Sequence, residues 1–474
     1  MPVLIGLAAV LLLGILLVLG VRTARFRPEP IEAPPADEIP LDGAAAVEHL
    51  RQMIRCRTVS APEERDEAEF ERFRDLLPRC YPQVFSRCRV ERVDSTGLLI
   101  RWEGKRHEAP AVFLSHYDVV PADPEAWEKP PFDAVLEDGV LWGRGALDMK
   151  NQLCCTLEAM EYLLKQDFRP ERNIYMALSG EEEIMGPTAE TIRDLFRQRG
   201  IAPAFVLDEG GDIIDGFFPG TDQTCAMVGV GEKGVANLHF VAKSAGGHAS
   251  VPTKDNPLLR LCQAVTRLRS FPQRSCPALE RMVDVMGRYC DSKTRLLLAN
   301  RDVLRPLYYR WLRRQGGMLE ATSRTTVALT RARGSSVGNV IPTEAELFAN
   351  VRMLWGDTTE SVIRRLRKEM RDPGIEIQKS VCADPRPDSE LTEGWDALRS
   401  AIRATWPEAV VTPYLMVATT DARHWRDICP NVYRFSAKTV TGEEKATVHG
   451  NNERIRVENT LRGAQFFVRL MRQL

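Results

Sequence analysis

Three apolar, strand-like segments of the sequence each end in histidine or acidic residues. His116 and Asp118 close the first segment, the consecutive glutamates 181–183 follow the second, and Asp208 follows the third. In open α/β sheets, ligands bind beyond the carboxyl ends of the strands. The three clusters could therefore converge on one pocket, where they could bind a metal and move protons.

Each cluster also has an ordinary structural interpretation. His116 and Asp118 can point to the same side of a strand, but a lone His-x-Asp pair is more often a structural histidine beside a carboxylate. Asp148 opens a predicted helix, where a helix cap is the plain alternative. The glutamates 181–183 repel one another unless a cation or solvent relieves them, so the alternative there is a solvated acidic turn.

Considered together, these side chains form a set that is typical of zinc. His449, in the motif Val-His-Gly-Asn-Asn-Glu, adds a second imidazole to Asp148, Asp208 and the glutamates 181–183. Mixed imidazole and carboxylate donors are common zinc ligands in enzymes. The sequence therefore predicts a zinc site at the edge of the sheet.

The elements that must position these residues follow an α/β pattern. From about residue 42, apolar strand-like runs alternate with amphipathic helix-like runs, as in a parallel sheet covered by helices. From residue 234 the pattern of strand-like and helix-like runs changes, which favours a smaller α/β domain inserted into the first. We expect a catalytic domain in two parts, at 43–233 and 357–474, separated by a lid domain at 234–356.

The N-terminus differs in composition from the rest of the chain. No residue from 1 to 21 is charged, and the apolar run is long enough to cross a bilayer, which needs about 20 apolar residues. A cleaved signal peptide is the alternative, but the usual basic start and small-residue cleavage site are absent. We expect a transmembrane anchor at 1–22 and a Pro-rich tether at 23–42. The arginines that follow the apolar run favour a cytoplasmic catalytic part.

Composition excludes some classes of protein. The 64 basic and 65 acidic residues leave a formal charge of -1, which gives no electrostatic reason to expect a nucleic-acid partner. The 11 cysteines form no Cys-x-x-Cys pair and imply no disulfide framework. Their odd number favours a reducing compartment.

From about residue 45 to its C-terminus, the chain resembles the two-zinc aminoacylase and carboxypeptidase family. It is most similar to the branch of carboxypeptidase S and the N-acyl-amino-acid hydrolases. The resemblance implies a zinc-exopeptidase-like α/β catalytic domain interrupted by a smaller α/β lid, through which relatives often dimerise. Its most specific stretches are SHYDVVP (115–121), GRGALDMK (143–150), EEEIMG (181–186), GHASVP (247–252), GNVIP (338–342) and HGNNE (449–453).

The same resemblance implies a set of metal ligands. His116 and Asp208 would hold one zinc, Glu183 and His449 the other, and Asp148 would bridge the pair. Glu209 follows the same strand as Asp208 and is the alternative ligand; Asp208 is preferred because it directly follows the apolar run. Cobalt or manganese could replace zinc.

Roles in catalysis and substrate binding follow from the resemblance as well. Glu182 would be the general base, and Asp118 would fix the ring of His116. His248 in the lid would stabilise the oxyanion, and relatives often lend this histidine across a dimer. Arg352 and Asn339 would hold the substrate, with the Arg352 guanidinium suited to a free carboxylate.

The expected reaction is hydrolysis of an amide bond next to a free carboxylate, in N-acyl amino acids or short peptides. Two alternatives are condensation by the reverse reaction and a membrane-tethered binding protein that has lost catalysis. The presence of Glu182 and of every expected ligand argues against the second. Two departures bear on substrate range: Glu181 stands where relatives usually have Asp, and 418–423 has Ala and Thr where Gly is common. The Leu- and Tyr-rich stretch 296–312 indicates an apolar acyl pocket or a plain buried core.

Overall fold

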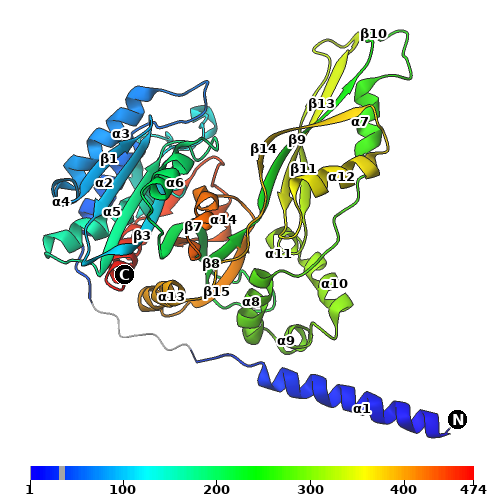
Figure 1. The fold of residues 1–474 in the computed structure, drawn as a ribbon, viewed down its shortest axis with the longest axis horizontal. Coiled ribbons are helices and arrows are strands. Elements are labelled where there is room, and N and C mark those ends of the chain that lie inside the picture. Colours follow the sequence, from blue (N-terminus) through cyan, green and yellow to red (C-terminus); the bar gives the residue numbers. More distant parts are fainter. Residues whose placement is uncertain (1, 31–37) are drawn as a thin grey trace.

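An eight-stranded mixed sheet forms the centre of the larger of two lobes (Figure 1). The computed structural model describes residues 2–30 and 38–474. Four neighbouring strands in the middle of the sheet, β6, β3, β7 and β16, are parallel. In spatial order the strands are β1 (Arg89–Val93), β2 (Gly97–Trp102), β6 (Arg172–Ser179), β3 (Arg106–His116), β7 (Phe205–Ile214), β16 (Val432–Thr439), β8 (Cys225–Glu232) and β15 (Val410–Met416).

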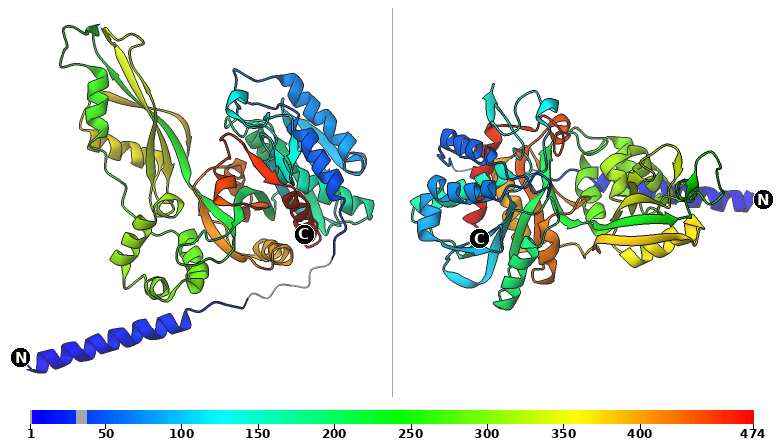
Figure 2. Two further views of the ribbon diagram at one scale, coloured as in Figure 1. Left: turned by 180° about the vertical axis from the view of Figure 1, so that it is seen from behind. Right: turned by 90° about the horizontal axis from the view of Figure 1, so that it is seen from above.

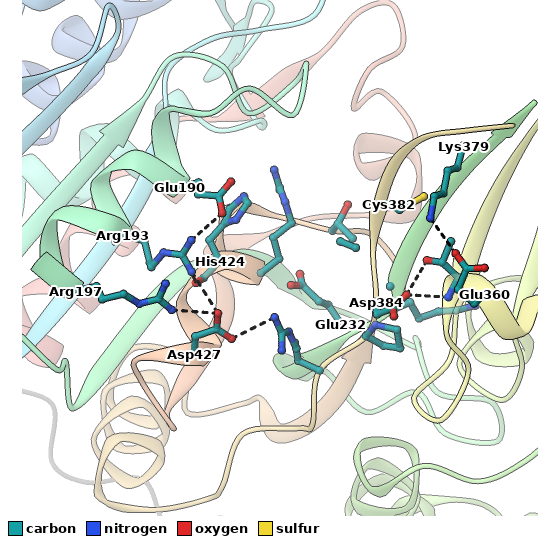
Figure 3. Close-up of a pocket in the computed structure, with 18 residues that line it drawn as sticks. Glu190, Arg193, Arg197, Glu232, Glu360, Lys379, Cys382, Asp384, His424 and Asp427 are labelled. Carbon is teal, nitrogen blue, oxygen red and sulfur yellow. Dashed lines mark hydrogen bonds and ion pairs between the residues drawn. The ribbon is translucent and has the colours of Figure 1, made fainter.

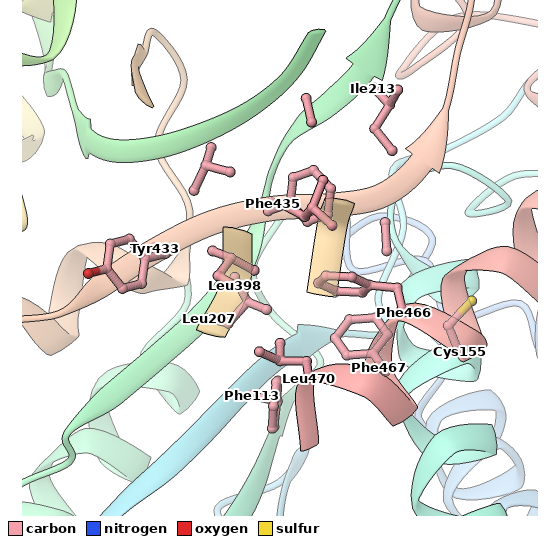
Figure 4. Close-up of a cluster of buried hydrophobic side chains, with 14 of the residues drawn as sticks. Phe113, Cys155, Leu207, Ile213, Leu398, Tyr433, Phe435, Phe466, Phe467 and Leu470 are labelled. Carbon is pink, nitrogen blue, oxygen red and sulfur yellow. The ribbon is translucent and has the colours of Figure 1, made fainter. Parts of the chain in front are cut away.

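Helices cover both faces of this sheet, which explains why its central strands are continuous apolar runs. Along β3, Phe113 packs into the larger hydrophobic cluster while its neighbours Val112 and Leu114 pack into the cluster on the opposite face. Figure 4 shows Phe113 with Phe467 and Leu470 in the first of these clusters. That face is covered by α2 (Gly43–Ile54), α3 (Glu67–Cys80), α4 (Pro82–Arg87), α5 (Lys150–Lys165), α13 (Glu393–Thr405) and α15 (Glu458–Met471), and the other by α6 (Thr188–Gln198) and the 3-10 turn η3 (Asp421–Asp427).

Short elements at the rim complete the large lobe. A three-stranded sheet joins β17 (Arg454–Arg456), β5 (Val140–Trp142) and β4 (Val135–Glu137). The 3-10 turn η1 (Pro124–Ala126) and helix α14 (Gly442–Lys445) lie in the connecting loops. This small sheet brings the C-terminal segment next to the loop that precedes α5.

The smaller lobe is an arm built on a four-stranded antiparallel sheet. Its strands, in spatial order, are β11 (Thr326–Arg333), β13 (Glu344–Met353), β9 (Gly234–Lys243) and β14 (Ile375–Ala383). Helices α7 (Pro257–Val265) and α12 (Thr359–Met370) pack on it and share its own hydrophobic cluster. The two-stranded pair β10 (Gly247–His248) and β12 (Val340–Ile341) forms the far tip of the arm (Figure 1).

The expected domain boundaries require two corrections. The arm does not end at residue 356, because α12 and β14 complete its core and sheet and extend it to Ala383. The local alternation of apolar and polar residues could not reveal this, because β14 pairs with β9, which is far from it in the sequence. The second correction concerns helices that lie inside 234–356 but pack against β15 and the core of the large lobe: α8 (Pro277–Met286), η2 (Gly287–Tyr289), α9 (Ser292–Ala299), α10 (Arg305–Gln315) and α11 (Gly317–Ala321).

A single apolar helix, α1 (Pro2–Arg25), projects from the body of the molecule (Figures 1 and 2). Residues Leu4–Arg25 are long and apolar enough to cross a membrane, with a mean hydropathy of 3.0, and the apolar window is not buried in the structure. A signal sequence passes the same test. Of the predicted tether 23–42, residues 31–37 lie outside the described residues.

Candidate metal centre

The carboxyl ends of β3 and β6 and the middle of the neighbouring strand β7 bring most of the predicted site residues together. His116 is the last residue of β3 and pairs with Ser179 at the end of β6, which Gly180 separates from the glutamates 181–183. On the other side of β3, strand β7 carries Glu209. The convergence expected from the sequence is therefore present at one edge of the sheet.

Asp148 lies between the two histidines, with one carboxylate oxygen facing each. His116 Nε2 is 3.0 Å from Asp148 Oδ1, and His449 Nε2 is 3.1 Å from Asp148 Oδ2. His449 Nε2 is also 3.0 Å from Glu183 Oε2, and His116 Nε2 is 3.3 Å from Glu209 Oε1. The site thus has two halves that share one carboxylate.

The donor atoms are spaced like ligands of one metal. His116 Nδ1 lies 3.1 Å from the carbonyl oxygen of Asp118, which can only accept, so Nδ1 carries a proton. Without a cation, the carboxylates of Glu209, Asp118 and Asp148 raise the pKa of His116 well above its ordinary value; when Nε2 gives up its proton, it faces Asp148 and Glu209 as a metal ligand. Ligand atoms about 2.1 Å from one tetrahedral zinc lie about 3.4 Å apart. The observed spacings of 3.0 and 3.3 Å are of that size.

Electrostatics also favours a cation at this site. Burial, together with the neighbouring Asp148, raises the pKa of Glu183 to about 7 and that of Glu209 to about 8. Burial raises the pKa of Glu182 well above its ordinary value, and nearby Asp421, Glu209 and Glu183 add to the effect. A divalent cation among these carboxylates would relieve their repulsion. Two groups of donors lie within 4.8 Å of one another: His116, Asp148 and Glu183, and His116, Glu182 and Glu209.

Asp208, the ligand preferred from the sequence, does not face the histidines in this structure. Asp208 Oδ2 accepts the backbone N–H of Ala422 at 2.7 Å, and Oδ1 accepts the N–H of Glu209 at 2.9 Å. Neighbouring side chains on a strand point to opposite faces, so Glu209 faces His116 while Asp208 faces η3. Glu209, the alternative kept open from the sequence, takes this place in the site.

Asp118 organises the site in two ways. Its oxygens accept the backbone N–H groups of Glu182 and Glu183, each at 3.1 Å, and its side chain is completely buried. Its Oδ1 also lies 3.4 Å from His116 Nδ1. Asp118 therefore positions both the expected base and an expected metal ligand, whereas the sequence indicated only the contact with His116.

Glu453 has a positioning role that the sequence reasoning missed. Its carboxylate accepts backbone N–H groups of Gly145 at 3.0 Å, Leu147 at 2.7 Å and Asp148 at 3.1 Å, and it pairs with buried Arg144 at 2.8 Å. It thus fixes the loop that carries Asp148. The only sequence signal was its place at the end of the His449 motif.

The predicted substrate residues lie in two separate places. Arg352 is at the base of the arm, where its Nη1 donates to Thr419 Oγ1 at 3.1 Å. His248 and Asn339 are exposed at the tip of the arm, where the Ala249 N–H donates to the Asn339 carbonyl at 3.0 Å. Within one chain the structure does not bring His248 or Asn339 to the metal cluster (Figure 1).

A cavity of about 370 Å³ opens beside the metal cluster. Asp148, Glu182, Glu209 and His449 form one side of it. Its lysines, Lys438 and Lys445, both pair with Asp212, at 3.3 and 2.6 Å. The rest of the lining is largely apolar and includes Met318, Tyr414, Met416, Val417, Val440 and Val448. The Leu- and Tyr-rich stretch 296–312 does not line this cavity. Among the helices from α8 to α11, only α11 contributes a lining residue, Met318.

A wider groove of about 800 Å³ separates the two lobes (Figure 3). Its charged side chains already pair with one another, for example Arg193 with Glu190 at 2.8 Å and Lys379 with Glu360 at 2.9 Å. Asp427 pairs with Arg386 on the opposite wall at 3.3 Å. The groove marks the junction of the lobes and carries none of the metal-cluster residues.

Comparisons with known proteins agree with this geometry. Residues 112–473 match the model of peptidase family M20/M25/M40. The chain is 32% identical to the "Probable carboxypeptidase S-like 2" of Dictyostelium discoideum, over 98% of this chain and 92% of that protein. It is 34% identical to the "N-fatty-acyl-amino acid synthase/hydrolase PM20D1" of Bos taurus, over 87% of this chain and 84% of that protein.

Solved structures share the fold at low sequence identity. The M20 family metallo-carboxypeptidase Sso-CP2 from Sulfolobus solfataricus superposes with a TM-score of 0.67 at 17% identity, covering 90% of this chain and 98% of that one. Human carnosine dipeptidase 1 gives a TM-score of 0.65 at 16% identity, with 91% and 96% covered. The resemblance seen in the sequence is confirmed: the chain belongs to peptidase family M20/M25/M40 and is a hydrolase that acts on amide bonds.

Proposed function

We propose that the protein binds two zinc ions and hydrolyses the amide bond of N-acyl amino acids that carry an apolar acyl chain and a free carboxylate. The observation that carries this proposal is the position of Asp148, whose two oxygens face His116 and His449 at 3.0 and 3.1 Å. One half of the site would use His116 and Glu209, the other Glu183 and His449, with Asp148 shared. Zinc suits this mixture of imidazole and carboxylate donors.

Each site residue then has a defined task. Two bound zinc ions would supply hydroxide at neutral pH and polarise the substrate carbonyl. Glu182 accepts the proton of the attacking water and passes it to the leaving amine nitrogen. Its backbone N–H is held by Asp118 at 3.1 Å, which fixes the base beside the ligands. Arg352, at the junction of the lobes, pairs with the carboxylate of the substrate.

The cavity supports an apolar acyl group in the substrate. Its side chains near the metal cluster include Met318, Tyr414, Met416 and Val417, and its lysines are neutralised by Asp212. A relative in Bos taurus is named as a synthase and hydrolase of N-fatty-acyl amino acids. Condensation would use the same groups in reverse, so the supply of fatty acid and amino acid decides the direction.

We further propose that α1 stays attached as a membrane anchor. Asn300 is completely buried, and its amide donates to the carbonyl of Leu19 at 3.3 Å and to Thr23 Oγ1 at 3.1 Å. Arg22 pairs with Asp302 at 2.7 Å, and Phe26 packs against the core of the large lobe. Removal of a signal peptide ending in this region would take these partners away and leave the Asn300 amide with the carbonyl of Leu296, at 2.9 Å, as its acceptor.

A second copy of the chain would complete the active site. His248 and Asn339 are exposed at the tip of the arm, away from the metal cluster of their own chain (Figure 1). A homodimer formed through the arms could bring His248 of one copy to the substrate held by the other. The imidazole would then donate to the oxyanion that develops on the carbonyl oxygen.

The test is a measurement of bound metal and turnover on the full chain in detergent. Long-chain and short-chain N-acyl amino acids, dipeptides and their C-terminal amides form the substrate panel. We expect about two zinc ions per chain, hydrolysis that chelation abolishes and zinc restores, and a preference for long acyl chains with a free carboxylate. Arg352→Lys should reduce that carboxylate preference by about tenfold while leaving the amides unaffected.

The general base is tested by Glu182→Gln. We expect the variant to bind both ions and to lose turnover by about 10²- to 10⁴-fold. Near wild-type turnover in Glu182→Gln would place the base elsewhere. A metal-free protein that stays inactive with added zinc would favour the binding protein that has lost catalysis.

A further inference from the structure

The end of α1 is fixed to one particular part of the catalytic body. Arg22 forms a two-pronged ion pair with Asp302, at 2.7 and 3.0 Å. The Arg288 guanidinium stacks 5.4 Å above the ring of Phe26 and pairs with Glu29 at 2.7 Å. These contacts, with the Asn300 contacts to Leu19 and Thr23, hold the end of the apolar helix against α9 and η2.

This attachment determines which surface meets the bilayer, if α1 spans it as proposed above. Arg22 ends the apolar run and must lie at the level of the lipid headgroups. Asp302 is in direct contact with Arg22, so it lies at that level too. The segment that contains it, from α9 to α10, is thereby brought to the membrane surface.

The same segment exposes apolar side chains that nothing in the described residues covers. Leu296 is 41% exposed, Val303 54% and Leu307 55%. Aromatic residues flank them on α10: Tyr309 and Trp311 are half-buried. Such side chains are typical of the interfacial zone, where an apolar body meets lipid and a polar edge meets water.

Charge along the segment complements lipid phosphate. Residues 292–315 hold one acidic residue, Asp302, and seven basic ones: Lys293, Arg295, Arg301, Arg305, Arg310, Arg313 and Arg314. Asp302 is already paired with Arg22, and Arg301 with Glu280 and Asp284, so the other six basic side chains make up the excess. The whole chain has a formal charge of only -1, so this local excess is a property of the segment.

Helix α10 presents an exposed apolar side chain and basic side chains on one side. Leu307, Arg310 and Arg314 are spaced i, i+3 and i+7, which places them along one face of the helix. Tyr308 and Leu312 are buried on the other side, against the body of the large lobe. The side chains of Arg310 and Arg314 form no hydrogen bond or ion pair with any residue that the structure describes.

We propose that the α9–α10 segment is a membrane-contact surface, which inserts Leu296, Val303 and Leu307 among the lipids and binds anionic headgroups through Arg310 and Arg314. The surface holds the catalytic body against the bilayer in a fixed orientation. It rests on the proposed anchor, but it adds a second contact with lipid that α1 alone does not require.

The test uses the full chain in liposomes of phosphatidylcholine and phosphatidylserine, with or without brominated acyl chains that quench tryptophan. Leu307→Trp and Val303→Trp are compared with Val251→Trp, which places the same probe at the tip of the arm on a residue that is 71% exposed. The emission added by each tryptophan over that of the parent is measured. We expect the added emission at 307 and 303 to shift to the blue and to be largely quenched, and that at 251 to be unaffected.

Charge is tested by adding Arg310→Glu and Arg314→Glu to Leu307→Trp. We expect lipid quenching of the tryptophan at position 307 to fall in this variant. It should fall similarly when Leu307→Trp alone is measured in liposomes without phosphatidylserine. Flotation of the parent with liposomes after alkaline carbonate treatment tests the anchor separately. If the protein floats but positions 307 and 303 are quenched no more than position 251, the contact surface is overturned and the anchor stands. If the protein does not float, both are overturned, while zinc-dependent hydrolysis in the same samples reports on the active site independently.

Discussion

Glu453 accepts a hydrogen bond from the backbone N–H of Asp148 at 3.1 Å, although the two residues are 305 positions apart in the chain. Together with the N–H groups of Gly145 and Leu147, this contact fixes the loop on which Asp148 stands between two histidines. The proposed bridge between two ions requires both oxygens of Asp148 to keep facing the two histidines, and a fixed backbone would ensure this. Glu453 is therefore a positioning residue for Asp148.

Glu453→Gln should weaken metal binding without removing a ligand. An amide has one acceptor oxygen in place of two, so part of the set of N–H groups and buried Arg144 would lose a partner. We expect zinc affinity to fall by about 10- to 100-fold, as for other residues that orient metal ligands. Titration against a competing chelator measures this. Unchanged affinity together with a lowered melting temperature would reduce Glu453 to a purely structural role.

Glu209 and Asp208 are a matched pair for testing the ligand set. Glu209→Gln should lower the bound zinc by about one equivalent, because it removes the carboxylate that faces His116 at 3.3 Å. Asp208→Asn should keep both ions and instead lower stability, since Asp208 accepts the N–H groups of Ala422 and Glu209. Metal analysis and thermal unfolding of both variants decide the assignment. The reverse pattern would restore Asp208 as the ligand.

The metal-free protein should become less stable as the pH rises. Burial raises the pKa of Glu183 to about 7 and of Glu209 to about 8, while neighbouring carboxylates raise the pKa of His449 to about 11. All three groups bind more protons in the folded than in the unfolded state, so the free energy of unfolding falls with pH. For the two glutamates the loss runs from about pH 4.5 to about pH 8.

Thermal unfolding of chelated protein between pH 5.5 and pH 8 checks this. We expect its melting temperature to fall across that range and zinc to restore more stability at pH 8 than at pH 5.5, because the ions replace the bound protons. The Glu209→Gln variant is the control, and its pH dependence should be shallower. A chelated protein that gains stability toward pH 8 would contradict the proposed crowding of carboxylates.

The sequence was most informative where structure is local. The spacing of Leu153, Leu157, Met160 and Leu164 predicts a helix at 149–165, and α5 runs from Lys150 to Lys165. The strand ends likewise indicated where the acids and histidines would meet. Long-range pairing was not accessible in this way. Nothing in the local pattern of 375–383 says that this segment joins the sheet of the arm.

The direction of side chains set a second limit on what could be predicted from the sequence. Asp208 and Glu209 are adjacent acids inside β7, and only the packing of η3 decides which of them faces the metal site. Glu453 was visible as part of a motif, but its contacts with the loop at 145–148 depend on the small sheet of β17, β5 and β4. Arrangements of this kind are made by tertiary structure and leave no periodic signal.

His248 provides the test of a shared active site. His248→Ala should lower turnover strongly, because it removes the donor proposed for the oxyanion; loss of one such donor costs about 10²- to 10³-fold. The variant should still bind both ions, since His248 lies at the tip of the arm and outside the metal cluster. Turnover and bound zinc together separate this outcome from a folding defect.

Mixing two inactive variants distinguishes a histidine lent by a partner from one used within the chain. In a dimer of His248→Ala with Glu182→Gln, one site would combine the intact base of the first copy with the histidine of the second. Random exchange of subunits at equal amounts should therefore recover about a quarter of the parent activity. Asn339 lies beside His248 at the same tip, so Asn339→Ala should be rescued by Glu182→Gln in the same way. If neither mixture gains activity although subunits exchange, His248 acts in its own chain, and the arm must then fold toward the cavity during turnover.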